Sequence, residues 1–442
     1  MSLCLCPLHC LQWQHVALLM DNRTPEFYGW REFPASDTYE RVETRMVDIP
    51  ATTVHVPAAS ANRTLTAISI AHWVSHFHIF VLPMLFPFLK DRLGVSYIDL
   101  GFALTTFAVV SGLTQAPIGF LVDRVGARII LILGVMLGGC ALVTLGLFLS
   151  YPALIICAGL LGLANSVYHP ADYAILAAHM DEAKMGRAFS LHTFAGFVGG
   201  AVAPPMMVAL LASIGGAGAL VVAGGIGVAI ALMLIVVGIP DAGAMKSGGN
   251  APAARVSVMT PAILMLLLFF TLLALSQGGI NSFGIVALMN GYGITLSSAN
   301  IALTSFLGAG AAGVLAGGWL ADRTLHHSRV AAVCFTINAA IIGLIAAFSP
   351  PAPVIIAAMA LAGFLGGVIT PSRDMLVRQA APPGAAGRAF GIVSTGFNFS
   401  GIVSPIMFGW FMDHAMPHWV FGASACFMAM TVLLAVVSER KR

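Results

Sequence analysis

The stretch Gly119-Phe-Leu-Val-Asp123-Arg124-Val-Gly126-Ala-Arg128 lies between two long apolar runs, and it decides how the chain folds. It places one carboxylate, two guanidinium groups and two glycines within ten residues. Charged side chains are costly inside hydrocarbon, so this segment must face water. Its glycines allow a tight turn where a side chain would clash. We therefore predict a short, water-facing connection between two membrane-spanning helices.

The same stretch recurs in the second half of the chain. Gly318-Trp-Leu-Ala-Asp322-Arg323 repeats Gly119–Arg124 at an offset of 199 residues. Further matches keep nearly the same spacing: ALTTF at 103–107 with ALTSF at 302–306, GRAF at 186–189 with GRAF at 387–390, Pro170 with Pro371, and Pro204 with Pro405. This pattern predicts two homologous halves with the same order of elements, the internal symmetry found in secondary transporters.

The composition is that of a membrane protein. Of the 442 residues, 59% are hydrophobic and only 9% are charged, whereas a soluble domain carries about 25% charged residues. The apolar residues form runs of about twenty, which is the length needed to cross about 30 Å of hydrocarbon. A β-barrel would show short alternating segments instead. We predict an all-α polytopic membrane protein.

Twelve apolar runs are predicted to span the membrane, six in each half. They cover residues 65–89, 98–122, 129–149, 152–177, 188–212 and 217–239, and then 261–289, 297–321, 330–348, 353–376, 389–412 and 418–437. The predicted domains are a six-helix half at 65–239, a Gly/Ala/Pro/Ser-rich linker at 240–260, a second half at 261–438 and a short tail at 439–442.

Residues 1–64 differ from the rest because they are polar and show no helical period. We interpret them as a disordered cytoplasmic tail or, alternatively, as the result of a coding start placed too early, with Met46 as the true start.

Lysine and arginine predict the orientation. Alternate connections carry basic pairs: Arg124 and Arg128, Lys184 and Arg187, Lys246 and Arg255, Arg323 and Arg329, and Arg378 and Arg388. The opposite connections are nearly free of basic residues, apart from Lys90 and Arg92. We expect both termini in the cytoplasm and the protein in a bacterial inner membrane.

The two halves, their linker and the Gly119–Arg128 motif resemble the major facilitator superfamily over residues 65 to 438. The motif follows that family's G-x-L-x-D-R-x-G-x-R pattern, with Ala127 in place of a second basic residue. The second copy departs more, since Leu325 replaces its glycine and histidines follow. The resemblance implies a twelve-helix bundle of two pseudo-symmetric six-helix halves, and we expect the protein to be a monomer. Its first, fourth, seventh and tenth helices would line a cavity.

Two shorter features resemble particular branches of that family. Ser75-His76 and Ser166-Val-Tyr-His169-Pro170 resemble the fosmidomycin-resistance branch of efflux proteins. The fifth span, with Gly196, Gly200 and Pro204, is similar to the antiporter helix of proton-driven drug exporters. It lacks the Gly-Pro-x-x-Gly-Gly run of that helix, so the direction of transport stays open.

Polar residues inside the spans concentrate in the four helices expected to line the cavity. They are His72, His76, Asn165, His169, Asp172, Gln277, Asn281, Arg373 and Asp374, with Asn398 from the eleventh span as an addition. Ionisable groups inside membranes are usually functional, so we predict that these residues form the substrate or proton pathway. The alternative for each is a structural hydrogen bond or a local ion pair.

The histidines and the aspartate are the candidate proton carriers. His72 and His76 share one helix face, as do His169 and Asp172. Imidazole titrates near neutral pH, and a neighbouring carboxylate stabilises the imidazolium. His78 lies on a different face and is the weaker candidate. Arg373 could hold an organic anion through its planar fork, or it could pair with Asp374.

The two Asp-Arg turns are expected to form a cytoplasmic gate. The candidates are Gly119, Asp123, Arg124, Gly126, Arg128, Gly318, Asp322 and Arg323. Charges at helix ends can pair with facing helix termini of the other half. The alternative is a purely topological role set by the distribution of basic residues.

We predict a secondary transporter that moves a small organic molecule by alternating access, with proton-coupled efflux favoured. An uptake symporter for an organic anion is the main alternative. No G-x4-G-K-[S/T] motif occurs, so the drive would be an ion gradient. A membrane metalloenzyme is a remote alternative, because no His-Glu-x-x-His motif occurs either. We expect no enzymatic activity, cofactor, metal site or nucleic-acid partner; the partners would be the substrate, protons and the lipid bilayer.

Overall fold

The computed structural model describes residues 58–180, 184–240, 259–321, 323–324, 326–382 and 386–440. These residues belong to one compact unit, His55–Arg442. Most of the predicted tail and linker, and the gate residue Asp322, lie outside the described residues. The domain limits given above stay a prediction.

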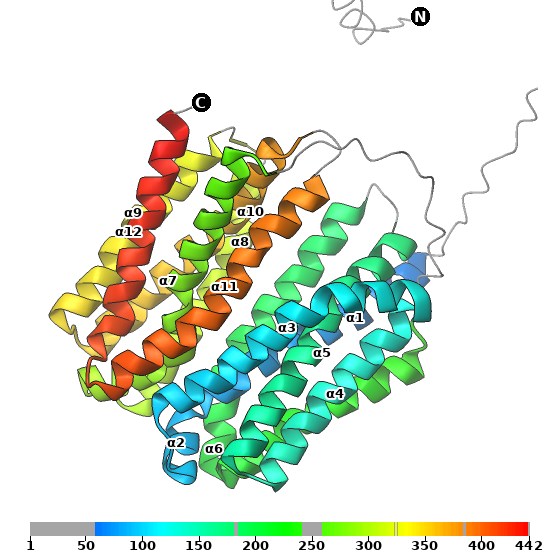
Figure 1. Cartoon of the computed structure of the whole chain (residues 1–442), viewed down its shortest axis with the longest axis horizontal. Coiled ribbons are helices and arrows are strands. Elements are labelled where there is room, and N and C mark those ends of the chain that lie inside the picture. Colours follow the sequence, from blue (N-terminus) through cyan, green and yellow to red (C-terminus); the bar gives the residue numbers. More distant parts are fainter. Residues whose placement is uncertain are drawn as a thin grey trace, which may run out of the picture. The chain divides into compact units, whose positions relative to one another are not determined.

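The described residues form helices joined by short turns (Figure 1). The first half of the chain gives α1 (Ala58–Met84), α2 (Phe86–Leu93), α3 (Tyr97–Val125), α4 (Ala127–Leu147), α5 (Tyr151–His179) and α6 (Met185–Val237). The second half gives α7 (Pro261–Tyr292), α8 (Leu296–Ala321), α9 (His327–Phe348), α10 (Ala352–Ala380), α11 (Ala386–Asp413) and α12 (His418–Arg440). Eleven of these helices are long and apolar enough to cross a membrane.

Helix α6 accounts for two of the twelve predicted spans. At 53 residues it would be about 80 Å long, far more than the roughly 30 Å of hydrocarbon in a bilayer. Its regular geometry is interrupted at Gly215, where φ is 74° and ψ is 167°. This backbone conformation favours glycine. The break separates the two segments predicted at 188–212 and 217–239, so the twelve-span prediction is confirmed.

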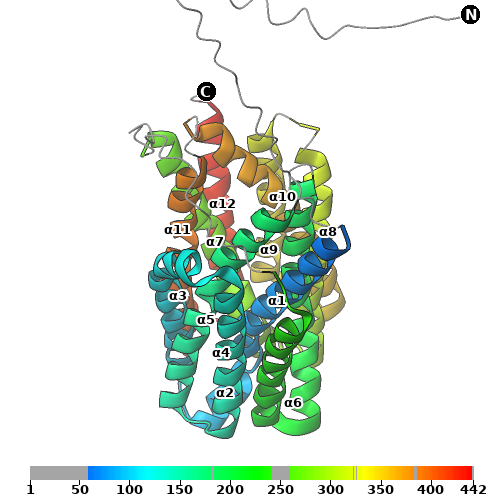
Figure 2. The same ribbon diagram turned by 90° about the vertical axis from the view of Figure 1, so that its right-hand side faces the viewer.

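The first span differs from its prediction. One helix was expected over 65–89, but α1 ends at Met84 and the separate helix α2 begins at Phe86. Pro87 occupies the first turn of α2, where the missing N–H of proline costs nothing. Leu85 bonds back to the carbonyl of Leu82 in a tight turn. Gly94 then ends α2 with a φ of 65°. Helix α2 lies at the opposite end of the bundle from the end of α12 (Figures 1 and 2).

The symmetry of the sequence recurs in the packing of the helices. In the first half, a Cβ on Gly162 of α5 would collide with the backbone carbonyl of Phe107 on α3. In the second half, a Cβ on Gly363 of α10 would collide with the carbonyl of Phe306 on α8. These two pairs correspond to one another at the repeat offsets of 201 and 199 residues. Glycine permits such close contact between spanning helices.

The two halves meet at two corresponding crossings, α3 with α11 and α6 with α8. At the first crossing, Thr105 donates a hydrogen bond to the carbonyl of Ile402 at 2.9 Å. At the second, the Asn300 amide donates to the carbonyl of Pro204 at 3.0 Å. Both crossings lie in the part of the bundle nearer to α2.

Candidate functional site

Helices α1, α5 and α6 bring His72, Asp172 and His192 together inside the first half. One oxygen of Asp172, Oδ2, lies 3.5 Å from Nδ1 of His72 and 3.4 Å from Nε2 of His192. The two imidazoles stack with ring centroids 3.9 Å apart. All three side chains are buried, and Asp172 and His192 are 0% exposed. A single carboxylate therefore faces two imidazoles in an apolar interior.

Two further histidines extend this group, which we call the imidazole cluster: His72, His76, His169, Asp172 and His192. The rings of His76 and His169 lie 4.8 Å and 5.6 Å from the ring of His72, measured between centroids. His76 is half-buried and His169 is exposed. The cluster thus runs from an exposed imidazole to a fully buried carboxylate.

Glycines of α6 make room for this cluster. A Cβ on Gly196 would lie 2.8 Å from the His72 ring and 2.9 Å from the His76 ring. One turn further, Gly199 lies against the backbone carbonyl of Trp73. The small residues of the fifth span therefore let α6 approach α1 closely. This close approach carries His192 to the carboxylate on α5.

The polar atoms of the cluster are poorly paired. Neither oxygen of Asp172 has a hydrogen-bond partner among the described residues, and the distances to the imidazoles exceed those of strong charge-assisted hydrogen bonds. Burial of a charge without hydrogen bonds is costly. Loss or gain of a proton here would therefore change how α1, α5 and α6 hold together.

His72, Asp172 and His192 could in principle hold a metal ion, because their ligand atoms lie within 4.8 Å of one another. Metal-bound histidines almost always donate their second ring N–H to a partner. The Nδ1 atom of His192 has no hydrogen-bond partner in the part of the chain that the structure describes. At His192 the site therefore lacks this supporting contact.

His192 is absent from the residues predicted from sequence. It is the one ionisable residue in the predicted span 188–212, so the rarity of such groups in membranes was an available signal. The sequence did not show which helix packs beside α1. That contact is what makes His192 a partner of Asp172.

His78 serves packing and lies outside the cluster. Its Nε2 atom lies 3.1 Å from the carbonyl oxygen of Ala223 in the second segment of α6. The ring fills the space left by Gly138 and Gly227. These contacts favour a structural role in helix packing for His78 over a role in the proton pathway.

We expect His78→Ala to lower the free energy of unfolding by about 2–3 kcal/mol, because a cavity and a lost hydrogen bond both destabilise. Thermal unfolding of purified protein in detergent measures this effect. His179→Ala is the matched control, since the bond seen for the His179 ring among the described residues goes to the carbonyl of Ile175 on its own helix. Equal melting temperatures for the two variants would contradict the packing role.

Asn165 joins two helices of the first half. Its amide donates a hydrogen bond to Ser111 of α3 at 3.0 Å. It also lines a small cavity with Ser75 and Tyr168. Since Tyr168 Oη has no partner among the described residues, this cavity is polar enough to hold water.

Arg373 and Asp374, the charged candidates of the second half, pair with each other. The guanidinium of Arg373 contacts Asp374 through Nε and a terminal nitrogen, both at 2.9 Å. It lies over the rings of Phe270 and Phe397, at 4.8 Å and 5.3 Å from their centroids. The pairing of Arg373 with Asp374, which the sequence left as an alternative, is therefore what the structure shows.

The predicted amides of the second half lie near helix contacts. Gln277 lies beside Gly366 of α10, and Asn398 lies against Gly112 of α3 in the other half. The side-chain oxygen of Asn281 is buried without a partner among the described residues. No hydrogen bond or ring contact in the described ranges joins these residues to the imidazole cluster.

The first Asp-Arg turn is exposed. Asp123 and Arg124 end α3 at the surface, and Gly126 follows with a φ of 107°. Gly119, Asp123 and Pro170 line an open surface pocket of about 280 Å³ between α3 and α5.

The second turn is only partly described. The guanidinium of Arg323 stacks on Trp319 at 4.0 Å, while Asp322 lies outside the described residues. The gate role of both turns stays a prediction.

Comparison with known proteins agrees with this architecture. Residues 68–283 and 266–442 match the family model for the Major Facilitator Superfamily. The fosmidomycin resistance protein of Escherichia coli (strain K12) is 24% identical over 269 residues, which cover 59% of this chain and 65% of that protein. The match thus spans slightly less than two thirds of that relative.

A second relative and one solved structure extend the likeness over most of the chain. The uncharacterized MFS-type transporter YfnC of Bacillus subtilis (strain 168) is 24% identical over 376 residues, or 82% of this chain and 90% of that protein. The inward-facing, unoccupied structure of a bacterial homologue of the human lysosomal transporter Spinster has a TM-score of 0.73 at 15% identity. The superposed region covers 87% of this chain and 98% of the chain in that structure.

Proposed function

The chain belongs to the Major Facilitator Superfamily, and we propose that it exports a small organic molecule in exchange for protons. The family consists of secondary transporters, not enzymes, and the chain is a multi-pass membrane protein. Proton coupling, export and the residues that carry them are the parts proposed here. We propose that the protein lies in a bacterial inner membrane. The distribution of basic residues indicates that both termini face the cytoplasm.

The observation that carries proton coupling is the buried carboxylate of Asp172 between His72 and His192. An unperturbed imidazole changes its charge near neutral pH, and a carboxylate beside it stabilises the charged form. His169, which is exposed, provides a route for protons to reach the buried groups by way of His72. Because the three ionisable partners lie on three helices, a change in their protonation alters the interactions among those helices.

The second half supplies the groups for the organic substrate. Gln277 and Asn281 lie four residues apart on α7 and offer hydrogen bonds from one helix face. Phe270 and Phe397 offer apolar surface beside Arg373. Separate sites for proton and substrate in the two halves suit an exchange in which the two bind alternately.

The alternative, uptake of an organic anion with protons, would require Arg373 as its anchor. Arg373 already contacts Asp374 and two aromatic rings. An anion would have to displace that carboxylate, which favours export of a substrate that does not depend on Arg373.

Transport into inverted membrane vesicles tests the proposal. The substrate is first sought by screening a deletion strain for sensitivity to a compound panel. The panel includes fosmidomycin, because the name of the Escherichia coli relative refers to it, and other phosphonates. Acidifying the vesicle lumen should concentrate an exported substrate inside by about tenfold per pH unit for one proton exchanged, since each unit is worth 1.36 kcal/mol.

The matched control is the same vesicles after a protonophore has dissipated the pH difference, which should abolish the accumulation. A substrate that instead leaves the acidified lumen indicates the uptake symporter. Accumulation that is the same with and without the pH difference would contradict proton coupling.

A further inference from the structure

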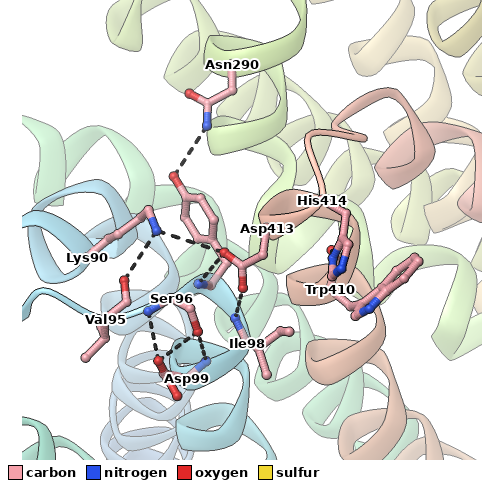
Figure 3. Close-up of polar contacts among 10 residues, drawn as sticks. Lys90, Val95, Ser96, Ile98, Asp99, Asn290, Trp410, Asp413 and His414 are labelled. Atoms are coloured by element: carbon pink, nitrogen blue, oxygen red, sulfur yellow. Dashed lines mark hydrogen bonds and ion pairs between the residues drawn. The ribbon is translucent and has the colours of Figure 1, made fainter.

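A carboxylate of the second half caps the N-terminus of a helix in the first half. Asp413, the last residue of α11, accepts hydrogen bonds from the backbone N–H groups of Tyr97 at 2.9 Å and Ile98 at 2.8 Å (Figure 3). These are the first two residues of α3. The first N–H groups of a helix have no partner within the helix. The next one, Asp99 N–H, is taken by the Ser96 hydroxyl, so Asp413 serves the two that remain.

Charge reinforces this contact. The N-terminus of a helix carries partial positive charge and attracts an anion. The ammonium of Lys90, on α2, lies 3.9 Å from Asp413 and over the ring of Tyr97 at 4.6 Å (Figure 3). Lys90 is one of the two basic residues that depart from the distribution used to orient the chain. Its contact with Asp413 explains why a basic residue lies at this end of the bundle.

Tyr97 also contacts a second helix of the other half. Its hydroxyl accepts a hydrogen bond from the Asn290 amide at 3.4 Å (Figure 3), and its ring meets Phe283 edge-on. A Cβ on Gly409 would lie 2.7 Å from the Tyr97 carbonyl, so glycine lets α11 approach the start of α3. The halves thus meet here through both polar and apolar contacts.

The fold does not require this arrangement. The corresponding crossing, α6 with α8, has Ala212 where the repeat offset of 201 residues maps Asp413, and Leu296 where the offset of 199 maps Tyr97. That crossing holds together without a carboxylate at these positions. The polar contact is therefore a feature of one side of the symmetry only.

We propose that Asp413, Lys90 and Tyr97 form a latch that holds the α2 end of the transport pathway shut and releases once in each cycle. The inference rests on the alternating access proposed above. A carboxylate and two backbone N–H groups can each bond to water when the halves separate, so the latch can open without stranding a polar group. Its charges make it stronger than a neutral contact while it is closed.

Distances between spin labels on the two halves test the latch. Phe148 and Ser297 are exposed, lie in different halves near the α2 end, and are replaced by cysteine in a background without native cysteines. Double electron–electron resonance spectroscopy then measures the fractions of molecules in which the two labels are close together or far apart. Asp413→Ala should raise the ratio of open to closed forms about tenfold. Lys90→Ala, which leaves the backbone bonds in place, should raise it about threefold.

Arg92→Ala is the matched control, because Arg92 is, like Lys90, a basic residue on α2, but it is exposed and lies outside the contacts that form the latch. It should leave the ratio unchanged. An unchanged ratio in folded Asp413→Ala and Lys90→Ala protein would overturn the latch. The measurement needs neither substrate nor a proton gradient. If Asp413→Ala changes the ratio but no proton-driven transport is found, the latch stands and the proposed function fails.

Discussion

Asp172→Asn is expected to lower proton-driven transport about a hundredfold, which corresponds to about 2.7 kcal/mol. The amide has nearly the shape of the carboxylate but cannot take up and release a proton near neutral pH. Asp172 is the only carboxylate within the imidazole cluster, and it contacts imidazoles from two other helices. Without it, the imidazoles of His72 and His192 lose the anionic partner that would stabilise their protonated form.

Uptake into inverted vesicles with an acid lumen measures this loss. Exchange of labelled for unlabelled substrate at equal pH is the companion assay, and it should stay within about threefold because no net proton movement is needed. Asp91→Asn is the matched control for removing one carboxylate. If Asp172→Asn and His76→Ala both keep gradient-driven transport, the proton role of this cluster is wrong.

Gly363→Ala is expected to destabilise the second half by about 3 kcal/mol, because overpacking in a close helix contact costs this much. The added methyl group would overlap the backbone carbonyl of Phe306. A backbone atom cannot move aside as a flexible side chain can, so α8 and α10 must separate along their length. The melting temperature should fall by about 5–10 °C, given the usual dependence on size.

Gly366→Ala is the matched control on the same helix. Its nearest neighbours are the ends of Gln277 and Asn338, at 3.8 Å and 3.9 Å from the added Cβ. Alanine is also the better helix former, so this variant should melt at the same temperature or higher. By the internal symmetry, Gly162→Ala should behave like Gly363→Ala. Similar melting temperatures for Gly363→Ala and Gly366→Ala would show that the close contact is not what holds α8 and α10.

The sequence predicted the fold because charge and apolar length constrain membrane proteins strongly. Asp123 and Arg124 could only lie at a helix end, and this property fixed the positions of the neighbouring spans. Even the split of α6 near Gly215 was visible, because the small residues around it interrupt the run of large apolar ones. The start of α2 was missed, since Pro83 and Pro87 lie in an apolar run whose hydropathy does not change.

The site was predicted only as far as single helices determine it. His72 and His76, or His169 and Asp172, share a face by their spacing alone. The meeting of Asp172 with His192, and of Lys90 with Asp413, depends on which helices are neighbours in space. Residues 90 and 413 are far apart in the chain, and no periodicity relates them. The packing of Gly196 and Gly409 decides these contacts, and glycines are too common here to mark them in advance.

The break at Gly215 has a mechanical consequence. The span that carries His192 and the span anchored to His78 through Ala223 are joined by one non-helical residue, with no loop between them. The corresponding spans of the second half, α11 and α12, are separated by the turn from His414 to Pro417. In the N-terminal half, a change of angle between these two spans must therefore be taken up by the backbone dihedral angles at Gly215. The C-terminal half can absorb the same movement in its turn.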